Sequence, residues 1–425
     1  MELLNAKGTR DFDPQDMILR NNLFSTLRRI FERYGFSPVE TPVLERFDIL
    51  AAKYAGGSEI LKETFRLNDQ GGRDLCLRYD LTVPFARYVG MRRSLKMPFK
   101  RYAIGPVFRD GPIKLGRYRE FYQCDADIVG TKSMLADADC IKIFQAFFKE
   151  IDMDVIIKVN NRKVLDTYLS WAGVAKDKLL EAVLIIDKLD KIGLEEVKKE
   201  LRGIGCDDEV CNKIEAVLDL DGDNQKLLAK LEELIGSCEG IDELKELLSY
   251  LDDTNVEISF ALARGLAYYT GTVFEVFLAD GSYDRALGSG GRYDSMIGEF
   301  VGGGREYPAV GCSFGIEPIT DMLKKQESLT QKTVTEIFIV PIKTVSECVK
   351  IADQLRSYGL NVDMDLLGKG ISKNLEYCNF YNIPFALIVG ENELASGRLQ
   401  LKNMATGEKE ELTVEEIVKK LVPVA

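Results

Sequence analysis

The chain of 425 residues contains no histidine, and this absence removes several kinds of chemistry. Serine or cysteine nucleophiles that depend on an imidazole base, histidine acid–base relays and zinc sites of the HExxH type are all impossible without it. Any reaction of this protein must therefore depend on carboxylates, arginine, lysine, tyrosine or the positioning of substrates.

Long apolar runs and paired cysteine motifs are also missing. No hydrophobic stretch approaches the length needed to span a bilayer, and the N-terminal residues MELLNAKGTRDF lack the layout of a signal peptide. We therefore expect a soluble, cytoplasmic protein without a membrane partner. The nine cysteines are an odd number, scattered without a CxxC pair or ligand-like spacing, which predicts reduced and mostly buried thiols.

The residues that are present suffice for two or three folded domains, with 46% hydrophobic residues and a formal net charge of -12. Residues 1–325 mix strand and helix signals and are expected to form one domain. Within it, residues from about 176 to 250 are rich in Leu, Lys and Glu with helical periodicity, which predicts an all-helical insertion; these helices could instead belong to one large core. Residues 334–425 alternate strands and helices, which predicts a small α/β domain with its own sheet.

Two shorter stretches have a readable local structure. Pro38 and Pro42 interrupt a strand-like run, which places that run at a sheet edge or a subunit contact. A strand predicted at 75–79 is followed by Asp80, Leu81 and Thr82, and Pro84 is expected to open the next helix. Polar residues at such a strand end are well placed to line a cleft.

Residues 108–130 have the features of a β-hairpin with an unusual distribution of charge. Two arms of strand character, YAIGPVFR and YREFYQCDADIV, flank a tip rich in glycine and proline. From Arg87 to Arg119 the chain has ten Lys or Arg and one acid, an excess that should attract phosphate. The second arm adds Asp125 and Asp127. We therefore expect a site that joins a nucleotide to a small polar molecule; the alternative is a solvated edge hairpin with incidental charges.

A glycine-dense tract, GSGGRYDSMIGEFVGGG, follows the later strands. A lone GxGxxG match is weak evidence for a dinucleotide fold, and Gly288, Gly290 and Gly291 are expected to lie between strands rather than to open a helix. Their expected role is to permit tight turns and the close approach of the backbone to a ligand.

Taken together, these segments resemble a histidyl-tRNA synthetase, a class II aminoacyl-tRNA synthetase, over nearly the full chain. The segments KGTRDF, GFSPVETPVLE (motif 1), LRYDLTVPFARY, the hairpin (motif 2), RGLAYYTGTVFE, GSGGRYD and PAVGCSFGIE (motif 3) occur in the family's order. RGLAYYTG and YREFYQCDADIVG resemble this family in particular, whereas motifs 1 to 3 alone would indicate only the class.

The resemblance implies an α+β catalytic domain of class II, whose active site lies on an antiparallel sheet flanked by helices. It implies a helical insertion that touches the acceptor arm of tRNA, and a C-terminal α/β domain that binds the anticodon. The implied partners are histidine, ATP and tRNA(His), within a homodimer joined partly through motif 1 and without a DNA partner. Magnesium is expected with ATP, its protein ligands unknown, and no tightly bound metal or organic cofactor is expected.

The resemblance also assigns roles to two arginines. Arg109 matches the motif 2 arginine, which fits holding both the amino-acid carboxylate and the α-phosphate, because a guanidinium offers a planar fork to each. Arg264 matches the arginine that this family uses at the α-phosphate. Both are candidate catalytic residues, since adenylation needs charge neutralisation and alignment more than proton transfer.

The remaining implied contacts are with histidine and with ATP. Asp127 matches the imidazole pocket, where a carboxylate accepts the ring N–H. The full histidine-binding set is Asp80, Leu81, Thr82, Arg109, Gln123, Asp127, Arg264, Tyr268 and Tyr269. The ATP-binding set is Arg109, Arg117, Tyr118, Arg119 and Phe121. For each of these residues the alternative is a structural ion pair or a core aromatic ring.

Three positions depart from the pattern of the class or family. Gly111 stands where the class usually has an acidic residue, which bears on one contact to the tRNA end or to adenine. Glu317 and Pro318 stand where motif 3 usually closes with an arginine for the γ-phosphate, so Arg264 or another cation must do more of the phosphate binding. Ala267 replaces an aspartate of many relatives, which suggests only a lost support contact.

The competing interpretation is a synthetase paralogue that has become a regulatory or RNA-sensing subunit of histidine metabolism without aminoacylation. Gly111 and Pro318 favour it slightly. The intact histidine-binding set and the full C-terminal domain, which such a subunit would not need, favour the ligase.

Overall fold

The computed structural model describes residues 2–53, 59–92, 94–113, 118–251, 255–263, 268–302, 305–325 and 331–422. The chain divides into two compact units. The first contains the residues up to 10 together with 23–321, and the second contains 11–22 together with the residues from 322 on. The division passes through two helices, α1 (Pro14–Arg33) and α14 (Ile316–Lys325). In the described part of the chain, no helix combines the length and the apolar character needed to cross a membrane.

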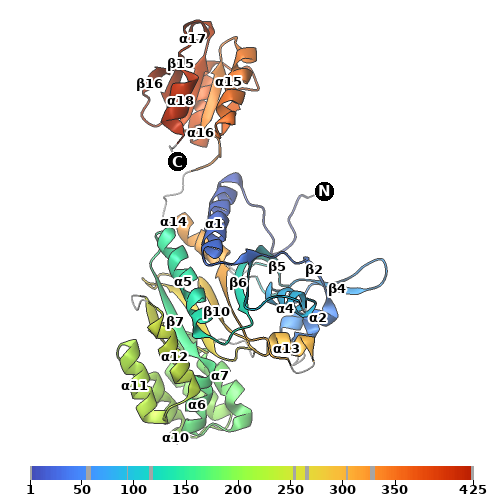
Figure 1. Cartoon of the computed structure of the whole chain (residues 1–425), viewed down its shortest axis with the longest axis vertical. Coiled ribbons are helices and arrows are strands. Elements are labelled where there is room, and N and C mark those ends of the chain that lie inside the picture. Colours follow the sequence, from blue (N-terminus) through green and yellow to red (C-terminus); the bar gives the residue numbers. More distant parts are fainter. Residues whose placement is uncertain are drawn as a thin grey trace. The chain divides into compact units, whose positions relative to one another are not determined.

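An eight-stranded sheet forms the centre of the first unit (Figure 1). Its strands are, in spatial order, β1 (Ser37–Pro38), β5 (Phe99–Phe108), β6 (Glu120–Val129), β11 (Ala309–Gly315), β10 (Gly288–Arg292), β9 (Thr272–Leu278), β7 (Val155–Asn161) and β8 (Val256–Ile258). Neighbouring strands are antiparallel except at the two edges, where β1 is parallel to β5 and β8 is parallel to β7. The predicted antiparallel sheet is confirmed.

Strands β5 and β6 form the predicted hairpin. Their register pairs Arg101 with Asp127 and Gly105 with Gln123. Pro38 lies in the edge strand β1, as its missing N–H requires. The tip residues 114–117 lie outside the described residues.

Helix α5 (Met134–Glu150) covers one face of the sheet through aromatic packing. The ring centroid of Phe144 lies 4.5 Å from that of Phe314 on β11, and the centroid of Phe147 lies 5.0 Å from it. Because side chains alternate along a strand, the neighbours of Phe314 on β11, Ser313 and Gly315, face the opposite side. Side chains that alternate along PAVGCSFG therefore point to two faces of the sheet, one packed on α5 and one that can line a binding site.

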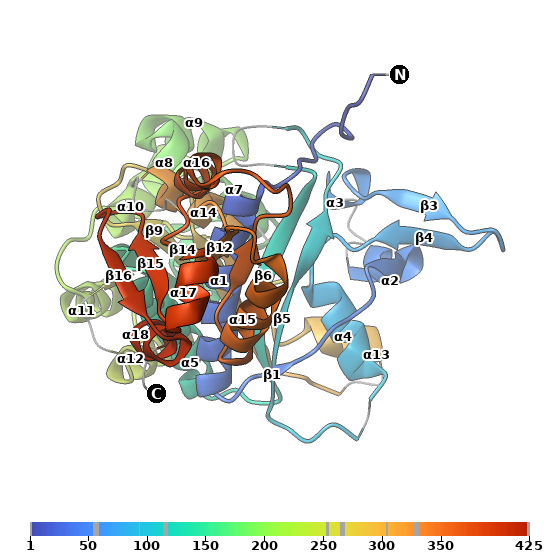
Figure 2. The ribbon, with the colours of Figure 1, turned by 90° about the horizontal axis from the view of Figure 1, so that it is seen from above.

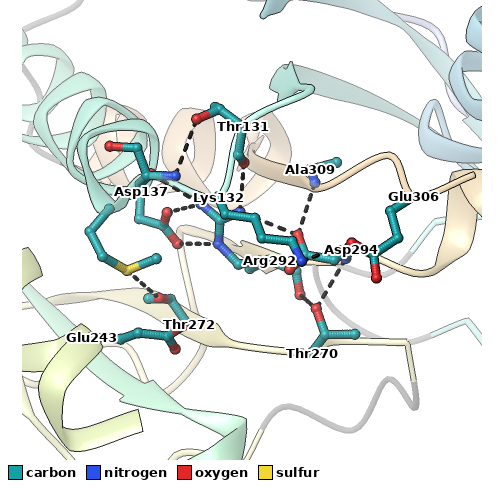
Figure 3. Close-up of polar contacts among 12 residues, drawn as sticks. Thr131, Lys132, Asp137, Glu243, Thr270, Thr272, Arg292, Asp294, Glu306 and Ala309 are labelled. Atoms are coloured by element: carbon teal, nitrogen blue, oxygen red, sulfur yellow. Dashed lines mark hydrogen bonds and ion pairs between the residues drawn. The ribbon is translucent and has the colours of Figure 1, made fainter. Parts of the chain in front are cut away.

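A buried ion pair fastens α5 to the end of β10 (Figure 3). The guanidinium of Arg292, 2% exposed, pairs with the carboxylate of Asp137, which is fully buried, and donates to the carbonyl of Thr131 at 2.9 Å. The same guanidinium contacts Asp294 at 3.2 Å, and Asp294 accepts the N–H of Ala309 at 3.0 Å. Burial raises the pKa of Asp137, and Arg292 opposes this shift. The network connects Ala309, at the start of β11, with Asp294, two residues after β10.

Replacing Arg292 by methionine should lower the free energy of unfolding of this unit by about 3–5 kcal/mol, because Asp137 would stay buried without its cation. The double variant Arg292→Met/Asp137→Leu should recover most of the loss. Urea unfolding can be followed through Trp171, the single tryptophan of the chain, which lies in α6 (Arg162–Ala172) of the same unit. Equal stability of the single and double variants would show that the pair is not the cause.

A group of helices adjoins the β7 side of the sheet and includes the predicted helical stretch (Figure 1). After α6 come the 3₁₀ turn η1 (Lys176–Lys178), α7 (Leu179–Ile186), α8 (Leu189–Ile192), α9 (Leu194–Gly203), α10 (Asp208–Leu218), α11 (Asn224–Ile235) and α12 (Glu239–Ser249). Strand β7 ends at Asn161, where the chain passes directly into α6. Its last residue, Asn161, caps α6 by accepting the N–H of Lys163 at 2.9 Å.

The first unit also contains a three-stranded sheet. It contains β2 (Leu44–Arg46), β4 (Asp74–Leu77) and β3 (Arg66–Asn68), with β3 and β4 extending past α2 in Figure 2. The nearby helices are α2 (Phe47–Lys53), α3 (Glu59–Lys62), α4 (Thr82–Gly90) and α13 (Met296–Val301). Helix α4 begins at Thr82 rather than at the predicted Pro84, and Asp80 Oδ1 accepts the N–H of Val83 in its first turn at 2.8 Å.

The expected position of the glycines Gly288, Gly290 and Gly291 between strands is wrong, because they form strand β10 itself. None of the three has a positive φ, so they do not make tight turns. They do permit close packing: a Cβ at Gly290 would lie 2.1 Å from the carbonyl oxygen of Gly311, and a Cβ at Gly291 would lie 2.8 Å from the Tyr269 ring.

The second unit contains the predicted α/β arrangement. Its sheet has the order β13 (Val362–Met364), β12 (Ile337–Pro341), β14 (Phe385–Val389), β15 (Leu399–Asn403) and β16 (Lys409–Leu412). Alternate residues of β12 pack on its two faces, Ile337 and Ile339 with α15 (Val345–Ser357) and Phe338 with α16 (Ile371–Tyr381). The C-terminal β15, β16, α17 (Glu391–Ser396) and α18 (Val414–Leu421) were not predicted individually.

The cysteine prediction is confirmed. All nine are free thiols, and all except the half-buried Cys238 are buried.

Candidate active site

A cavity of about 620 Å³ lies on the middle strands of the eight-stranded sheet. Its walls come from the turn between β4 and α4, from the hairpin, and from strands β10 and β11. Strand β6 supplies Gln123, Asp125 and Asp127, which share one face because each is two residues from the next. Strand β6 and strands β10 and β11, which are far apart in the sequence, therefore meet at this sheet face.

The carboxylate of Asp127 is held from two sides. Its Oδ2 pairs with Arg101 Nη2 at 2.7 Å across the β5–β6 ladder, and its Oδ1 accepts the hydroxyl of Tyr293. Asp127 is 3% exposed and Arg101 is 1% exposed. A Cβ at Gly311, its partner on β11, would lie 2.1 Å from Asp127 Oδ1, so only glycine leaves room for this carboxylate.

The tyrosines around Asp127 belong to the same pocket. Tyr293 is buried, and burial together with the Asp127 charge raises the pKa of its phenol, which therefore stays a hydrogen-bond donor. Tyr268 meets Tyr293 edge-on, with 6.3 Å between ring centroids, and lies 4.6 Å from Tyr269. A flat polar ring would find aromatic walls and an oriented carboxylate here.

Arg109 lines the cavity, and its guanidinium lies close to two aromatic rings. Its Cζ lies 4.4 Å from the centroid of Tyr79 and 4.9 Å from that of Phe121, and its Nε donates to the carbonyl of Tyr79 at 3.3 Å. Stacking of this kind holds the plane of the fork while leaving donors for an anion. Tyr118 also lines the cavity, and Arg10 both stacks on its ring and donates to its hydroxyl at 2.9 Å.

The predicted site residues are largely brought together. Those that line the cavity are Asp80, Thr82, Arg109, Tyr118, Phe121, Gln123, Asp127, Tyr268 and Tyr269. Leu81 and Arg119 are not among its described lining residues. The carbonyl of Leu81 accepts Arg101 Nη2 at 3.2 Å, and Arg119 pairs with Asp110 at 3.0 Å. Arg117 and Arg264 lie outside the described residues.

The inference that the cations between Arg87 and Arg119 form one phosphate-attracting excess is wrong for several of them. Arg87 pairs with Glu45 at 2.7 Å, Lys100 with Asp139 at 2.6 Å, and Arg101 with Asp127. The compensating acids come from outside the counted window or from the opposite arm of the hairpin. Of the counted cations that the structure describes, Arg109 alone lines the cavity.

Sequence reasoning missed several residues of this site. Tyr293 and Arg285 line the cavity, Arg101 orients Asp127, and the buried Glu317 accepts the N–H of Tyr122 at 3.3 Å. Asp125, expected on the acidic arm of the hairpin but not in the histidine-binding set, also lines the cavity. The period-2 pattern of β6 was a signal for Asp125, because it places that carboxyl on the face of Gln123 and Asp127. Nothing local in the sequence indicates that Tyr293 reaches Asp127 across 166 positions.

The chain is similar to known proteins over both units. The family model described as histidyl-tRNA synthetase matches residues 8–319, and the model described as anticodon binding domain matches residues 336–423. A "Histidine--tRNA ligase 1" of Bacillus thuringiensis is 43% identical over 419 residues, covering 96% of this chain and 97% of its own length. A "Histidine--tRNA ligase" of Bacteroides fragilis is 38% identical over 447 residues, covering 97% of each chain.

Solved structures agree with these matches. The crystal structure of histidyl-tRNA synthetase from Nostoc sp. PCC 7120 matches with a TM-score of 0.89 at 32% identity, covering 99% of this chain and 100% of that one. A Bacillus halodurans structure titled as an ATP phosphoribosyltransferase regulatory subunit/histidyl-tRNA synthetase shares the fold, with a TM-score of 0.74 at 22% identity. From the family models and the curated relatives, the chain belongs to the histidyl-tRNA synthetase family.

Proposed function

We infer that this protein is an ATP-dependent ligase that joins histidine to tRNA. Histidine attacks the α-phosphate of ATP through its carboxylate, which gives histidyl-adenylate and pyrophosphate, and the histidyl group then passes to the 3′ end of tRNA(His). The observation that carries this function is the cavity in which the stacked Arg109 and the oriented Asp127 stand on one sheet face. Such a site provides positioning and charge stabilisation without a proton-transferring histidine.

Asp127 is proposed to accept the imidazole N–H of histidine. Arg101 and Tyr293 fix its carboxylate, and a pre-oriented acceptor recognises an N–H without reorganisation. Tyr268 and Tyr269 bound the ring plane, and Asp80 and Thr82 stand at the end of the pocket proposed for the α-amino group.

Arg109 is proposed to bridge the substrate carboxylate and the α-phosphate, with Arg264 as the second cation at that phosphate. Arg285 is proposed to contact the phosphates, since Arg109 and Arg285 are the cations among the described cavity residues and Pro318 lines the same wall. Phe121 and Tyr118 offer rings to the base. Arg117 and Arg119 remain predicted ATP contacts. Magnesium enters with ATP as substrate; among the described residues no cluster of metal-binding side chains was found.

Domain roles and partners follow from the same function. We propose that residues 1–325 form the catalytic domain, that the helical insertion at about 176–250 contacts the tRNA acceptor arm, and that residues 334–425 read the anticodon. A homodimer joined through motif 1 and a cytoplasmic location, where translation uses charged tRNA, complete the proposal.

The direct test of the activation step is exchange of labelled pyrophosphate into ATP, measured separately with each amino acid. Histidine should support exchange at a rate well above that of every other amino acid. A protein that exchanges with none of them would favour the non-aminoacylating subunit. Gly111 and Pro318 slightly favour that regulatory subunit, whereas the curated relatives are named as ligases.

Deleting residues 334–425 should separate the two steps. The deletion removes the proposed anticodon reader and leaves the cavity residues in place, so histidine-dependent pyrophosphate exchange should persist while the rate of tRNA charging falls sharply. Both rates are measured on the same preparation, with sedimentation to follow the oligomeric state. Full charging by the shortened protein would contradict the role given to this domain.

A further inference from the structure

Two buried oxygen atoms on β6 have neither a hydrogen-bond donor nor an ion-pair partner among the described residues. They are Gln123 Oε1 and Asp125 Oδ1, from side chains that line the cavity two residues apart on the same strand face. Asp125 is only 4% exposed. A buried acceptor without a donor carries an unfavourable free energy, so such atoms in a cavity mark the place of a donating ligand.

The hydroxyl of Ser313 lies near both oxygens but cannot supply a donor to each of them. It donates to the carboxylate of Asp125 and accepts the amide of Gln123, Nε2 to Oγ, at 3.3 Å. A hydroxyl has one proton, so it cannot also donate to Gln123 Oε1. None of the described residues donates to either oxygen, and the buried Arg101 nearby keeps Nε and Nη1 without an acceptor. A bound ligand with at least two donors can satisfy both oxygens.

The charges around Asp125 call for a cation. Burial raises the pKa of its carboxyl to about 7, Arg101 on β5 and the Ser313 hydroxyl oppose the shift, and Asp127 and Asp80 add to it. Among the described residues, Arg78 and the buried phenol of Tyr293 are further titratable groups that interact with it. Arg101 pairs with Asp127, and Arg78 donates to the carbonyls of Pro106 and Thr41 at 2.7 and 2.8 Å. The three buried carboxyls Asp80, Asp125 and Asp127 thus outnumber the two buried arginines.

Histidine has one group that offers several donors and a positive charge, its α-ammonium. Its carboxylate only accepts, and its neutral imidazole donates once. We propose that Asp125 binds the α-ammonium of histidine through Oδ1, next to Gln123 Oε1 and Asp80 of the histidine-binding set already described. This assignment rests on the proposed function and adds Asp125 to the substrate-binding residues.

The assignment predicts which ligands bind more weakly when Asp125 is replaced. In Asp125→Asn, the affinity for histidine at pH 8 should fall at least about 30-fold, the scale for removing one partner of a buried hydrogen-bonded charge pair. The affinity for 3-(imidazol-4-yl)propionate, which is histidine without its amino group, should change less than about threefold. The affinity for histidinol, which keeps the amino group, should fall to a similar extent as that for histidine. Calorimetric titration measures all three.

Asp127→Asn is the matched control, because it makes the same chemical change two residues along β6. It should weaken binding of both histidine and the deamino analogue, since both carry the imidazole. Retained binding of the analogue by Asp125→Asn also shows that the variant is folded. If Asp125→Asn bound histidine as tightly as the wild type, or lost the analogue to the same extent while still folded, the assignment would be wrong.

The pH dependence gives a second readout that needs only wild-type protein. An ammonium replaces the proton of Asp125, so histidine affinity should fall as the pH drops below about 7, where the free carboxyl is protonated. The ratio of histidine to analogue affinities should fall about tenfold from pH 8 to pH 6, once each affinity is corrected for the separately measured titration of that ligand's own imidazole. A ratio that is constant or rises would overturn the assignment. Absence of histidine binding by the wild type at any pH would refute the proposed function itself.

Discussion

Replacing Asp127 by alanine is expected to lower kcat/KM for histidine activation by roughly two to four orders of magnitude, the scale seen when a site built around a hydrogen bond loses it. The carboxylate is already oriented by Arg101 and Tyr293, so the substrate N–H meets a fixed acceptor. Steady-state pyrophosphate exchange at varied histidine concentration measures the effect. Near wild-type kinetics would reject the imidazole pocket.

The Asp127→Ala variant needs a control, because it also removes the carboxylate partner of the buried Arg101. Removing the carboxylate leaves a guanidinium that is 1% exposed without its partner, which by itself destabilises a fold by about 3–5 kcal/mol. Asp127→Asn keeps the shape and an oxygen acceptor, and Tyr293→Phe removes one orienting hydrogen bond while keeping the charge pair. If the pocket assignment is correct, both lose less activity than Asp127→Ala at equal folded fraction.

Arg109→Ala should have the second large effect, a loss of about two to three orders of magnitude in the rate of adenylate formation, the range for removing one preorganised donor to developing charge. Single-turnover measurement of adenylate formation at saturating histidine and ATP isolates this step. The loss should exceed any change in histidine binding, because the charge at the α-phosphate develops during the reaction.

Arg109→Lys is the informative comparison. Lysine retains the positive charge but not the planar fork that contacts the rings of Tyr79 and Phe121. We expect it to recover only a small part of the rate. Full recovery would mean that charge alone matters at this position and that the bidentate role is incorrect.

Local patterns predicted the parts of the fold that local physics determines. Alternation in YAIGPVFR and YREFYQCDADIV gave the hairpin, and the prolines of GFSPVETPVLE placed β1 at a sheet edge. The glycines of β10 were misplaced because glycine is typical of turns, whereas here they make room for Tyr269 and for the backbone of β11. That requirement exists only once the strands are neighbours.

The candidate site was predictable in its members but not in their couplings. Asp80, Gln123 and Asp127 were identified, yet Arg101 was counted among cations for phosphate because its acid partner lies on the opposite arm of the hairpin. A count of charges along a stretch of sequence omits acids that the fold brings next to those cations from elsewhere in the chain. Asp125 was noted as acidic, but its missing donor became visible only when Ser313 was placed across from it on β11.

Charging of tRNA(His) with labelled histidine by the full-length protein tests the central claim most directly. The account predicts that ATP, histidine and tRNA(His) together give acid-stable histidyl-tRNA, that leaving out any one of them abolishes the product, and that Asp127→Ala reduces it in proportion to activation. A protein that binds histidine and tRNA but transfers no histidine to the 3′ end would contradict the account and would support the regulatory subunit.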